Sequence, residues 1–419
     1  MKALLHNLLI FLVVSLVLGS ALRFWPYLVY HAPLQDVRTV NPVLPPSPDD
    51  TVFEELRALG SDLHDLKFSG TLDAALRSEN AVGFLTDHFE QAQTALAWYR
   101  ADGAQRLRED APTRFARIPV LLVGVDPSNT PTALEVFRLH RLLLIYAGQA
   151  FQNGQTEEGL DAFRFSLALG DYLLQRPPLE RLYLADVVLT EALHFMTEVL
   201  PREHLTEELV AAVPSRAELD GALIDAYWLR AVVIANFADD PYKMYKAINP
   251  NFNPWVFQIM GGYHRTHTMN MIDEDFLEFQ ADVAGGIDQV RYGRRLLNTR
   301  PSHFFSFNPI GKKFMSVGAL VQPDAEEIVV RHGHVIALAD MVRLHAALAA
   351  QGAAWDGALI EETAARLELR DPFTNAPYRV NQQGLVEVFA PEDPRRQWTV
   401  QPAWIMRGMQ GPAAAQPKS

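Results

Sequence analysis

The residues best placed to do chemistry in this sequence are two histidines that stand three positions apart. His264 and His267 would share one face of a helix, and Asp273 follows within the next turns. Two imidazoles and a carboxylate are ligands that zinc accepts, so the trio is a candidate metal site. The glutamate base of a His-Glu-x-x-His site is missing, however. The alternative, which we favour, is a polar hinge opened by Gly261 and Gly262, in which the histidines bond backbone carbonyls. We therefore expect no cofactor.

An aromatic-rich stretch directly precedes the histidines. Four of its side chains are candidates to line a groove for a peptide or a glycan. They are Tyr242, Tyr245, Trp255 and Tyr263. Packing in the core or at a membrane surface is the commoner reason for such a composition. The segment 242–275 is the candidate ligand site, with structural packing as its alternative.

Several classes of function lack their residues here. The chain has no cysteine, which excludes disulfides, thiolate metal sites and a cysteine nucleophile. It carries no nucleophile elbow, phosphate loop or dinucleotide fingerprint. The formal net charge is -13, with 37 basic and 50 acidic residues and no basic stripe, so we expect no nucleic-acid partner. No catalytic constellation emerges, and we favour a protein that is not an enzyme.

The first thirty residues carry a membrane signal. An apolar stretch from Leu8 to Leu22 holds no charge, with Lys2 before it and Arg23 after it. Counted from Ala3, its length is near the lower bound of about 17–20 residues for a membrane span. A cleaved signal peptide would share the charged start and the apolar middle. Bulky aromatics after the stretch favour a retained anchor instead, because they suit the membrane interface. They are Trp25, Tyr27 and Tyr30.

This signal predicts a single-pass protein of the inner membrane with the bulk of the chain in the periplasm. The alternative is secretion after signal cleavage. Helical periodicity dominates the rest of the chain. The predicted fold class is mainly α: an N-terminal transmembrane helix, then antiparallel helical hairpins in a bundle or short solenoid, then a small C-terminal β-hairpin. The predicted segments are an anchor (1–30), a Pro-rich linker (31–48), a helical domain (49–300), a C-terminal helix plus β-hairpin module (301–408) and a disordered tail (409–419).

Three local patterns make sharper predictions. Asn153-Gly154 between two apolar periodic stretches predicts a turn that joins two helices. Ser215 and Glu218 form a capping-box pattern, which predicts a helix start. Tyr378–Val380 and Leu385–Phe389 have the composition of short strands.

The stretch from Ile145 to Leu173 resembles a tetratricopeptide unit. It reads as a helix, the Asn153-Gly154 turn, the acids Glu157 and Glu158, and a second helix that mixes small and large apolar residues. No clean 34-residue period continues on either side, and repeats need neighbours to bury their faces. The resemblance implies an antiparallel helical hairpin of the solenoid type, and a hairpin within an ordinary bundle is its alternative.

A longer resemblance covers the C-terminal part. The chain carries Asn308-Pro309-Ile310-Gly311, a long helix over Ile328–Ala350 and a closing motif of Asp371, Pro372, Phe373, Pro377 and Tyr378. With the anchor and the paired helices, these elements resemble a family of bacterial membrane-anchored helical proteins with no assigned activity. The resemblance implies architecture and location only. Within the motif, we expect Asp371 to bond the amides ahead of it and the two aromatic rings to pack back on the helix.

The function that these observations favour is protein–protein contact by a membrane-anchored periplasmic protein, as a scaffold or an assembly factor. Its expected partners are the cytoplasmic membrane and a protein of the cell envelope. The alternative is an envelope hydrolase or glycan-binding protein that uses the segment 242–275.

Overall fold

The computed structural model of the 419-residue chain describes residues 6, 9–15, 17–18, 32–39, 51–64, 66, 72–109, 134–175, 179–201, 204–239, 263–287, 325–351, 356–380 and 386–388. In this part of the chain helices dominate and strands are almost absent, so the predicted mainly α fold class is confirmed. The buried apolar side chains form one cluster that runs from Val37 to Val388.

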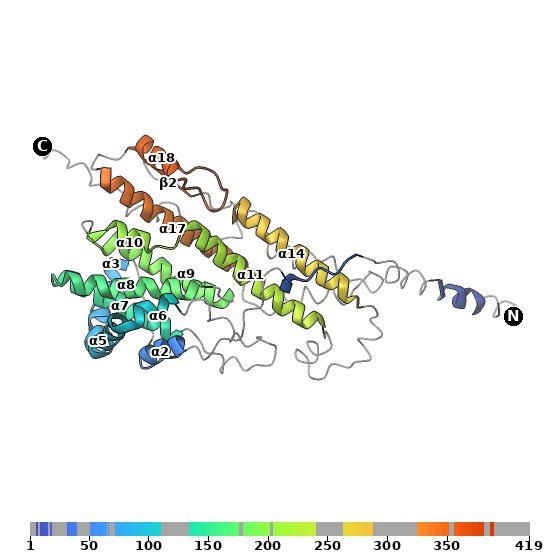
Figure 1. The fold of residues 1–419 in the computed structure, drawn as a ribbon, viewed down its shortest axis with the longest axis horizontal. Helices are drawn as coiled ribbons and strands as arrows, with labels where there is room; N and C mark the ends of the chain where they lie inside the picture. Colours follow the sequence, from blue (N-terminus) through green and yellow to red (C-terminus); the bar gives the residue numbers. More distant parts are fainter. Residues whose placement is uncertain are drawn as a thin grey trace.

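A helical hairpin of α7 (Leu134–Gln152) and α8 (Thr156–Leu174) forms the centre of the first helical group. Its turn is the predicted one. Gly154 has a φ of 75°, the left-handed region that glycine enters without a Cβ clash, and Gln155 N donates to Ala150 O at 2.8 Å. Both helices are buried on several faces because α9 (Leu179–His194) packs against α8 and short helices surround the hairpin (Figure 1). The short elements are α2 (Thr51–Gly60), α3 (Leu72–Leu76), α4 (Glu79–Asp87), α5 (Phe89–Trp98), the π-helical η2 (Tyr99–Gly103) and α6 (Ala104–Glu109).

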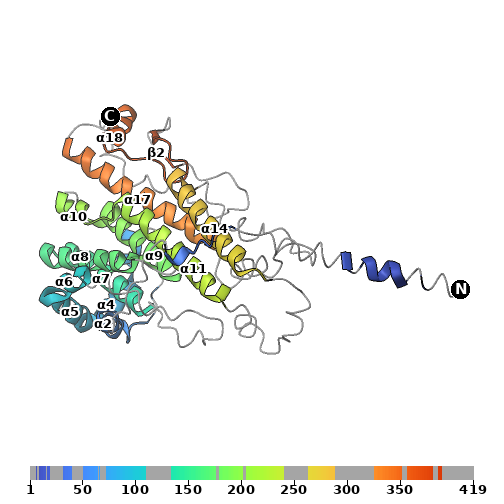
Figure 2. The ribbon, with the colours of Figure 1, turned by 45° about the vertical axis from the view of Figure 1, so that its right-hand side comes forward.

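A second group of longer helices packs on α9. The helix α17 (Ala325–Gln351) lies against α9 and α11 (Arg216–Asp239), and α11 runs beside α14 (Arg265–Gly285; Figures 1 and 2). The predicted capping box opens α11: Ser215 N donates to Glu218 Oε2 at 2.6 Å, and Glu218 N donates to Ser215 Oγ at 3.2 Å. Shorter elements complete the group. They are η1 (Val37–Thr39), η5 (Phe195–Val199), α10 (Glu207–Ala211) and α18 (Gly357–Arg366).

The predicted β-hairpin is reduced to a two-residue ladder among the described residues. β1 (Arg379–Val380) pairs antiparallel with β2 (Val386–Glu387), with Arg379 opposite Glu387 and Val380 opposite Val386. Cross-strand pairs stabilise a sheet, and two of them are too few for an independent hairpin. The ladder instead packs against α18, where Val380 N donates a hydrogen bond to Glu361 Oε1 at 2.8 Å.

The N-terminal stretch is helical where it is described, at residues 9–15 and 17–18, and in Figure 1 it lies apart from the packed helices. Among the described residues, one helix is long and apolar enough to cross a membrane: Ile328–Gln351, whose most apolar window is 67% buried against the rest of the fold. That helix belongs to α17. The predicted N-terminal transmembrane helix therefore stays a prediction.

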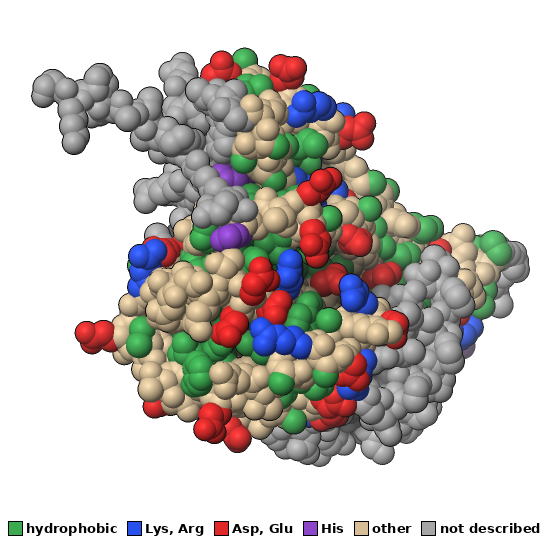
Figure 3. Space-filling view, turned by 60° about the vertical axis from the view of Figure 1, so that its left-hand side comes forward, with side chains coloured by type: hydrophobic (Ala, Val, Ile, Leu, Met, Phe, Trp, Pro, Cys, Tyr) green, Lys and Arg blue, Asp and Glu red, His purple; other side chains and the backbone are tan. Residues whose placement is uncertain are grey.

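Charges of both signs are mixed on the surface of the helical body. On the face seen in Figure 3, acidic and basic side chains lie interspersed among apolar ones. Arg106 pairs with Glu55 at 2.7 Å, and Arg100 pairs with Asp161 at 2.8 Å. Exposed pairs of this kind contribute about 0–1 kcal/mol each, so they favour solubility more than stability.

Candidate functional site

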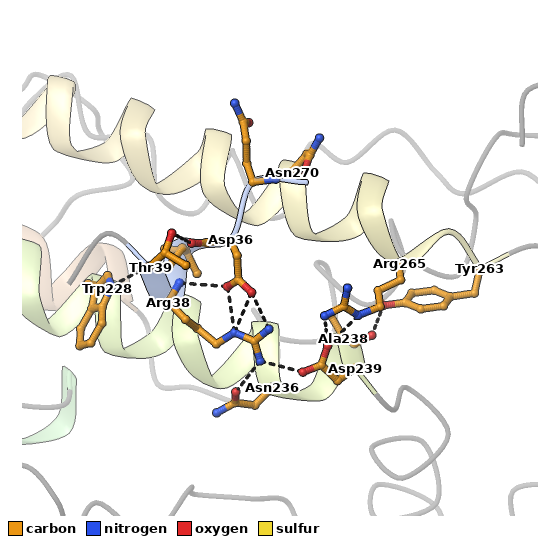
Figure 4. A network of polar contacts seen from close by, with 12 residues as sticks. Asp36, Arg38, Thr39, Trp228, Asn236, Ala238, Asp239, Tyr263, Arg265 and Asn270 are labelled. Atoms are coloured by element: carbon orange, nitrogen blue, oxygen red, sulfur yellow. Dashed lines mark hydrogen bonds and ion pairs between the residues drawn. The ribbon is translucent and has the colours of Figure 1, made fainter. Parts of the chain in front are cut away.

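Residues 32–39, which we call the strap, lie against α11 and α14 (Figure 4). The composition places these residues in a proline-rich linker, yet the strap makes specific contacts with helices that follow it by about two hundred positions in the chain. Because it connects the apolar N-terminal stretch to the helical body, its docking determines how the two are joined.

The helices hold the strap mainly through its backbone. Pro33 O accepts a hydrogen bond from Asn270 Nδ2 at 2.8 Å, and Gln35 N donates to Asn270 Oδ1 at 2.8 Å. Trp228 Nε1 donates to Val37 O at 3.0 Å, and the Val37 side chain is fully buried. The three bonded residues alternate along the strap, as they would along an extended chain whose successive residues face opposite sides.

A cluster of charged side chains closes one end of the strap. Arg38 Nη2 pairs with Asp36 at 2.6 Å, and its Nη1 reaches Asp239 at 2.7 Å and Asn236 Oδ1 at 3.1 Å. Arg265 Nη2 pairs with the other oxygen of Asp239 at 2.7 Å. The hydrogen bonds from Arg38 lower the pKa of Asp36. Burial opposes ionisation of Asp239, but its bonds to the two arginines outweigh burial and lower its pKa.

Asp273 lies one turn beyond Asn270 on α14, on the face that meets the strap. Its side chain is only 6% exposed, and its carboxylate makes no hydrogen bond or ion pair with any described residue. Burial, with a smaller contribution from the charge of Asp36, raises the pKa of Asp273. A largely buried carboxylate thus lies beside the docked strap, without a hydrogen bond to any described residue.

The two histidines predicted as metal ligands, His264 and His267, form the N-terminal cap of α14. His264 is the N-cap residue, and its Nδ1 accepts from His267 N at 3.2 Å. Capping satisfies an amide that would otherwise lack a partner in the first turn. Within the described ranges, no three histidine or carboxylate side chains come together as metal ligands. Of the candidate groove aromatics, Tyr263 donates its hydroxyl to Ala238 O, and burial raises its pKa to about 12.

The structure does not describe Trp25, Tyr27, Tyr30, Gly261 or Gly262. Six residues of the candidate groove and of the Asn-Pro-Ile-Gly element also lie outside the described residues. They are Tyr242, Tyr245, Trp255, Asn308, Pro309 and Gly311.

The closing motif forms a turn that joins α14 to α17. Asp371 Oδ1 accepts from Phe373 N at 2.7 Å and from Thr374 N at 3.1 Å, and Pro372 O accepts from Ile287 N at 2.8 Å. Phe373 is fully buried, with its ring 5.4 Å from that of His334. Gly333 makes this contact possible because a Cβ there would lie 2.8 Å from the Phe373 ring.

The end of the motif reaches a second position on α17. Pro377 forms an isolated bridge with Arg370. The hydroxyl of the buried Tyr378 donates to Asp340 Oδ2 at 3.0 Å. Burial raises the pKa of Asp340 to about 6.

A buried network of α7, α8 and α9 has the residue types of a catalytic triad. Ser166 Oγ lies 2.8 Å from His140 Nδ1, and His140 Nε2 lies 3.4 Å from Glu191 Oε2. A nucleophile must reach its substrate, but Ser166 and His140 are fully buried. Arg141 also binds Glu191, so the network is a polar link between three helices. The signal in the sequence was His140 on an otherwise apolar helix face, since a buried imidazole requires partners.

A second buried pair links α9 and α17. His332 Nδ1 lies 2.8 Å from Asp186 Oδ1, and its Nε2 lies 2.8 Å from Leu219 O. Asp186 and His332 are both fully buried. The pair is a structural contact, because no solvent reaches it.

No family model, curated protein or solved structure matches this chain. The strap and the helix surface that it contacts are accordingly judged by their own geometry. The helices hold residues 33–37 through backbone hydrogen bonds, and they hold the one-turn helix η1 through the buried Val37 and the ion pair of Arg38 with Asp239.

Proposed function

We propose that this chain is a membrane-anchored helical protein of the bacterial inner membrane whose periplasmic body mediates protein–protein contacts, as a scaffold or an assembly factor. The observation that carries the proposal is the exposed apolar helix at the N-terminus together with the strap that follows it. The likeness of the closing motif to a family of membrane-anchored proteins agrees with this location.

The N-terminal helix offers apolar side chains on all sides. Each large apolar side chain described there is between 48% and 68% exposed. Leaving such surface in water costs about 25 cal/mol per Å², and a helix that is apolar all round is typical of a core or a membrane. The side chains are those of Leu9, Ile10, Phe11, Leu12, Val13, Val14, Val17 and Leu18.

The strap brings one end of the body close to the anchor. Residues 19–32, which separate Leu18 from Pro33, span at most ~50 Å when fully extended. The site where the strap docks, at the end of α11 and the start of α14, would therefore be the part of the body nearest the membrane. A partner in the same membrane would meet this surface first.

The hydrolase or glycan-binding alternative rests on segment 242–275. In the described part of that segment, His264 caps a helix and Tyr263 bonds a backbone carbonyl, and both roles are structural. Protein–protein contact is the function that the geometry supports best.

Membrane attachment is tested by fractionation of cells that express the full chain. We expect the protein to stay in the membrane pellet after alkaline carbonate extraction and to leave it in the Val13→Arg variant. Val82→Arg is the matched control, because Val82 is an exposed valine on α4 and its replacement should leave the protein in the pellet. Equal extraction of all three proteins would contradict the anchor.

Protein contact is tested by crosslinking in living cells, followed by detergent extraction and mass spectrometry. A defined envelope protein captured in near-stoichiometric amount would support the scaffold function. Capture of abundant background proteins alone would refute it.

A further inference from the structure

We propose that the surface of α11 and α14 that contacts the strap, formed by Trp228, Asn236, Asp239 and Asn270, is a peptide-binding site occupied here by the chain's own strap. We call it the strap-binding surface. Its partner ligand is a segment of another envelope protein that has an aliphatic residue between an acidic and a basic one and that turns at the aliphatic residue, as the 3-10 helix Val37–Thr39 does. This inference rests on the proposed function and deepens it, because it names the surface that meets the partner.

The strap-binding surface forms hydrogen bonds with the backbone of the strap. Asn270 offers an acceptor and two donors on one side chain, and it bonds Gln35 N and Pro33 O in the same way that a neighbouring strand would. Two residues after Gln35, Val37 O accepts a hydrogen bond from Trp228 Nε1. Every peptide carries these backbone groups at the same spacing, so the bonds are available to any extended segment.

Three side chains of the strap supply the selectivity. Val37 is fully buried, which requires an aliphatic residue of similar size at that position. Asp239 on α11 forms an ion pair with the basic residue, Arg38, at 2.7 Å. Asp36 pairs with Arg38 inside the strap at 2.6 Å and so holds the guanidinium in place, and the charge of Arg265 on α14 adds a smaller favourable contribution. The strap-binding surface thus takes an aliphatic residue followed by a basic one, with the acidic residue before them orienting the basic one.

The strap is built so that it can be displaced. Leu34 is 49% exposed, so half of its side chain contributes nothing to docking. The ion pair of Arg38 and Asp239 is partly open to water, which weakens it. Asp273 is 6% exposed beside the strap, and its carboxylate would become more hydrated when the strap leaves. A tethered segment has a high effective concentration, and a partner confined to the same membrane would compete with it on similar terms.

The experiment measures strap release in the full chain. Because the chain has no cysteine, a Val37→Cys variant reports release through its rate of maleimide labelling. The competitor is a capped synthetic peptide with the sequence of residues 32–39. We expect it to accelerate labelling at least tenfold and saturably. A peptide with the Asp and Arg exchanged should have no effect.

Two variants serve as controls. Leu34→Cys has an exposed thiol in both states, so the peptide should not change its labelling rate. Adding Asn270→Ala to Val37→Cys should raise the basal labelling and abolish the peptide's effect, because the backbone bonds are lost for both occupants.

Binding is measured independently with a fluorescent form of the same peptide and the unmodified full chain, by anisotropy. Saturable binding that Asn270→Ala abolishes supports the proposal. The proposal is overturned if Asn270→Ala releases the strap but millimolar peptide neither accelerates labelling nor binds. Self-association of the protein through exchanged straps, lost in Asn270→Ala, would also overturn the proposal. It would mean that the strap-binding surface binds the strap of a second copy. Neither outcome affects carbonate extraction, which tests the anchor separately.

Discussion

Removal of one member of the buried Asp186–His332 pair should destabilise the protein strongly, whereas removal of both should cost much less than the sum. The pair connects α9 to α17, the helix that carries the contacts of the closing motif. His332 donates to Leu219 O as well as to Asp186, so both ring nitrogens have acceptors. Burial alone would lower the pKa of His332, but Asp186 and this carbonyl outweigh it, and the pKa is raised.

The magnitude follows from the burial of both groups. His332→Leu leaves a carboxylate in the core without its cation, which typically costs about 3–5 kcal/mol. Asp186→Ala leaves the imidazole without its acceptor at a similar cost. The double variant removes both charges and keeps roughly the original volume. It still leaves Leu219 O without a donor, so we expect partial recovery, with a coupling energy of at least ~2 kcal/mol.

The pH dependence has a definite sign. A group whose pKa is raised by folding stabilises the folded state fully below its unfolded pKa, about 6.5 for histidine. That contribution is lost as pH rises through the higher folded pKa. Burial raises the pKa of Asp186 as well, so the stability of the wild type relative to the double variant, which lacks both groups, should be largest near pH 6 and shrink toward pH 9.

The assay is urea unfolding followed by far-UV circular dichroism for the wild type, both single variants and the double variant. A coupling energy within ~0.5 kcal/mol of zero would refute the reasoning, because it would mean that the two side chains act independently. A stability difference between the wild type and the double variant that stays constant from pH 6 to pH 9 would also refute it.

Three further predictions concern the closing motif and the strap. Phe373→Ala should lower the free energy of unfolding by about 3–5 kcal/mol, since the Phe373 ring is fully buried against Gly333. Phe373→Leu should lower it by less. Urea unfolding measures both losses, and equal losses would contradict the packing argument. The pKa of Asp340 is raised to about 6, so its own contribution to stability should increase by about 3 kcal/mol as pH falls from 7 through 6 toward 4. Asp340→Asn should flatten that part of the pH profile, and an unchanged profile would exclude Asp340 as its source. Asp273→Asn should slow the maleimide labelling of Val37→Cys at pH 7, because a neutral amide is buried at lower cost than a carboxylate; unchanged or faster labelling would show that Asp273 does not loosen the strap.

Part of the candidate site could be found from the sequence. The segment 242–275 is a candidate site in the sequence, and it includes Asp273, which lies near Asp36 of the strap, while Tyr263 and His264 stand at the start of α14. Their roles differ from the expected ones, because the spacing of histidines on a helix cannot show which backbone amide one of them will cap. Asn270 was missed, since a single amide side chain on a helix carries no local signal.

Local patterns in the sequence are enough to predict several helices and some of their ends. The alternation of apolar and polar residues at helical spacing predicts α7, α8 and α17, and the Gly154 turn and the Ser215–Glu218 capping box are local contacts with local sequence signals. Such features need only neighbours in the chain, so their physical cause is visible in a short window.

Contacts between polar residues that are far apart in the chain could not be predicted from local patterns. Gln35 and Asn270 are 235 positions apart, and Asp186 and His332 are 146 apart. Contacts at such separations depend on how whole helices pack, and the periodicity that defines each helix does not specify its neighbours. The strap shows the consequence. The prolines of segment 31–48 predict an extended linker, whereas the packing of α11 and α14 gives residues 32–39 of that segment a surface on which they dock.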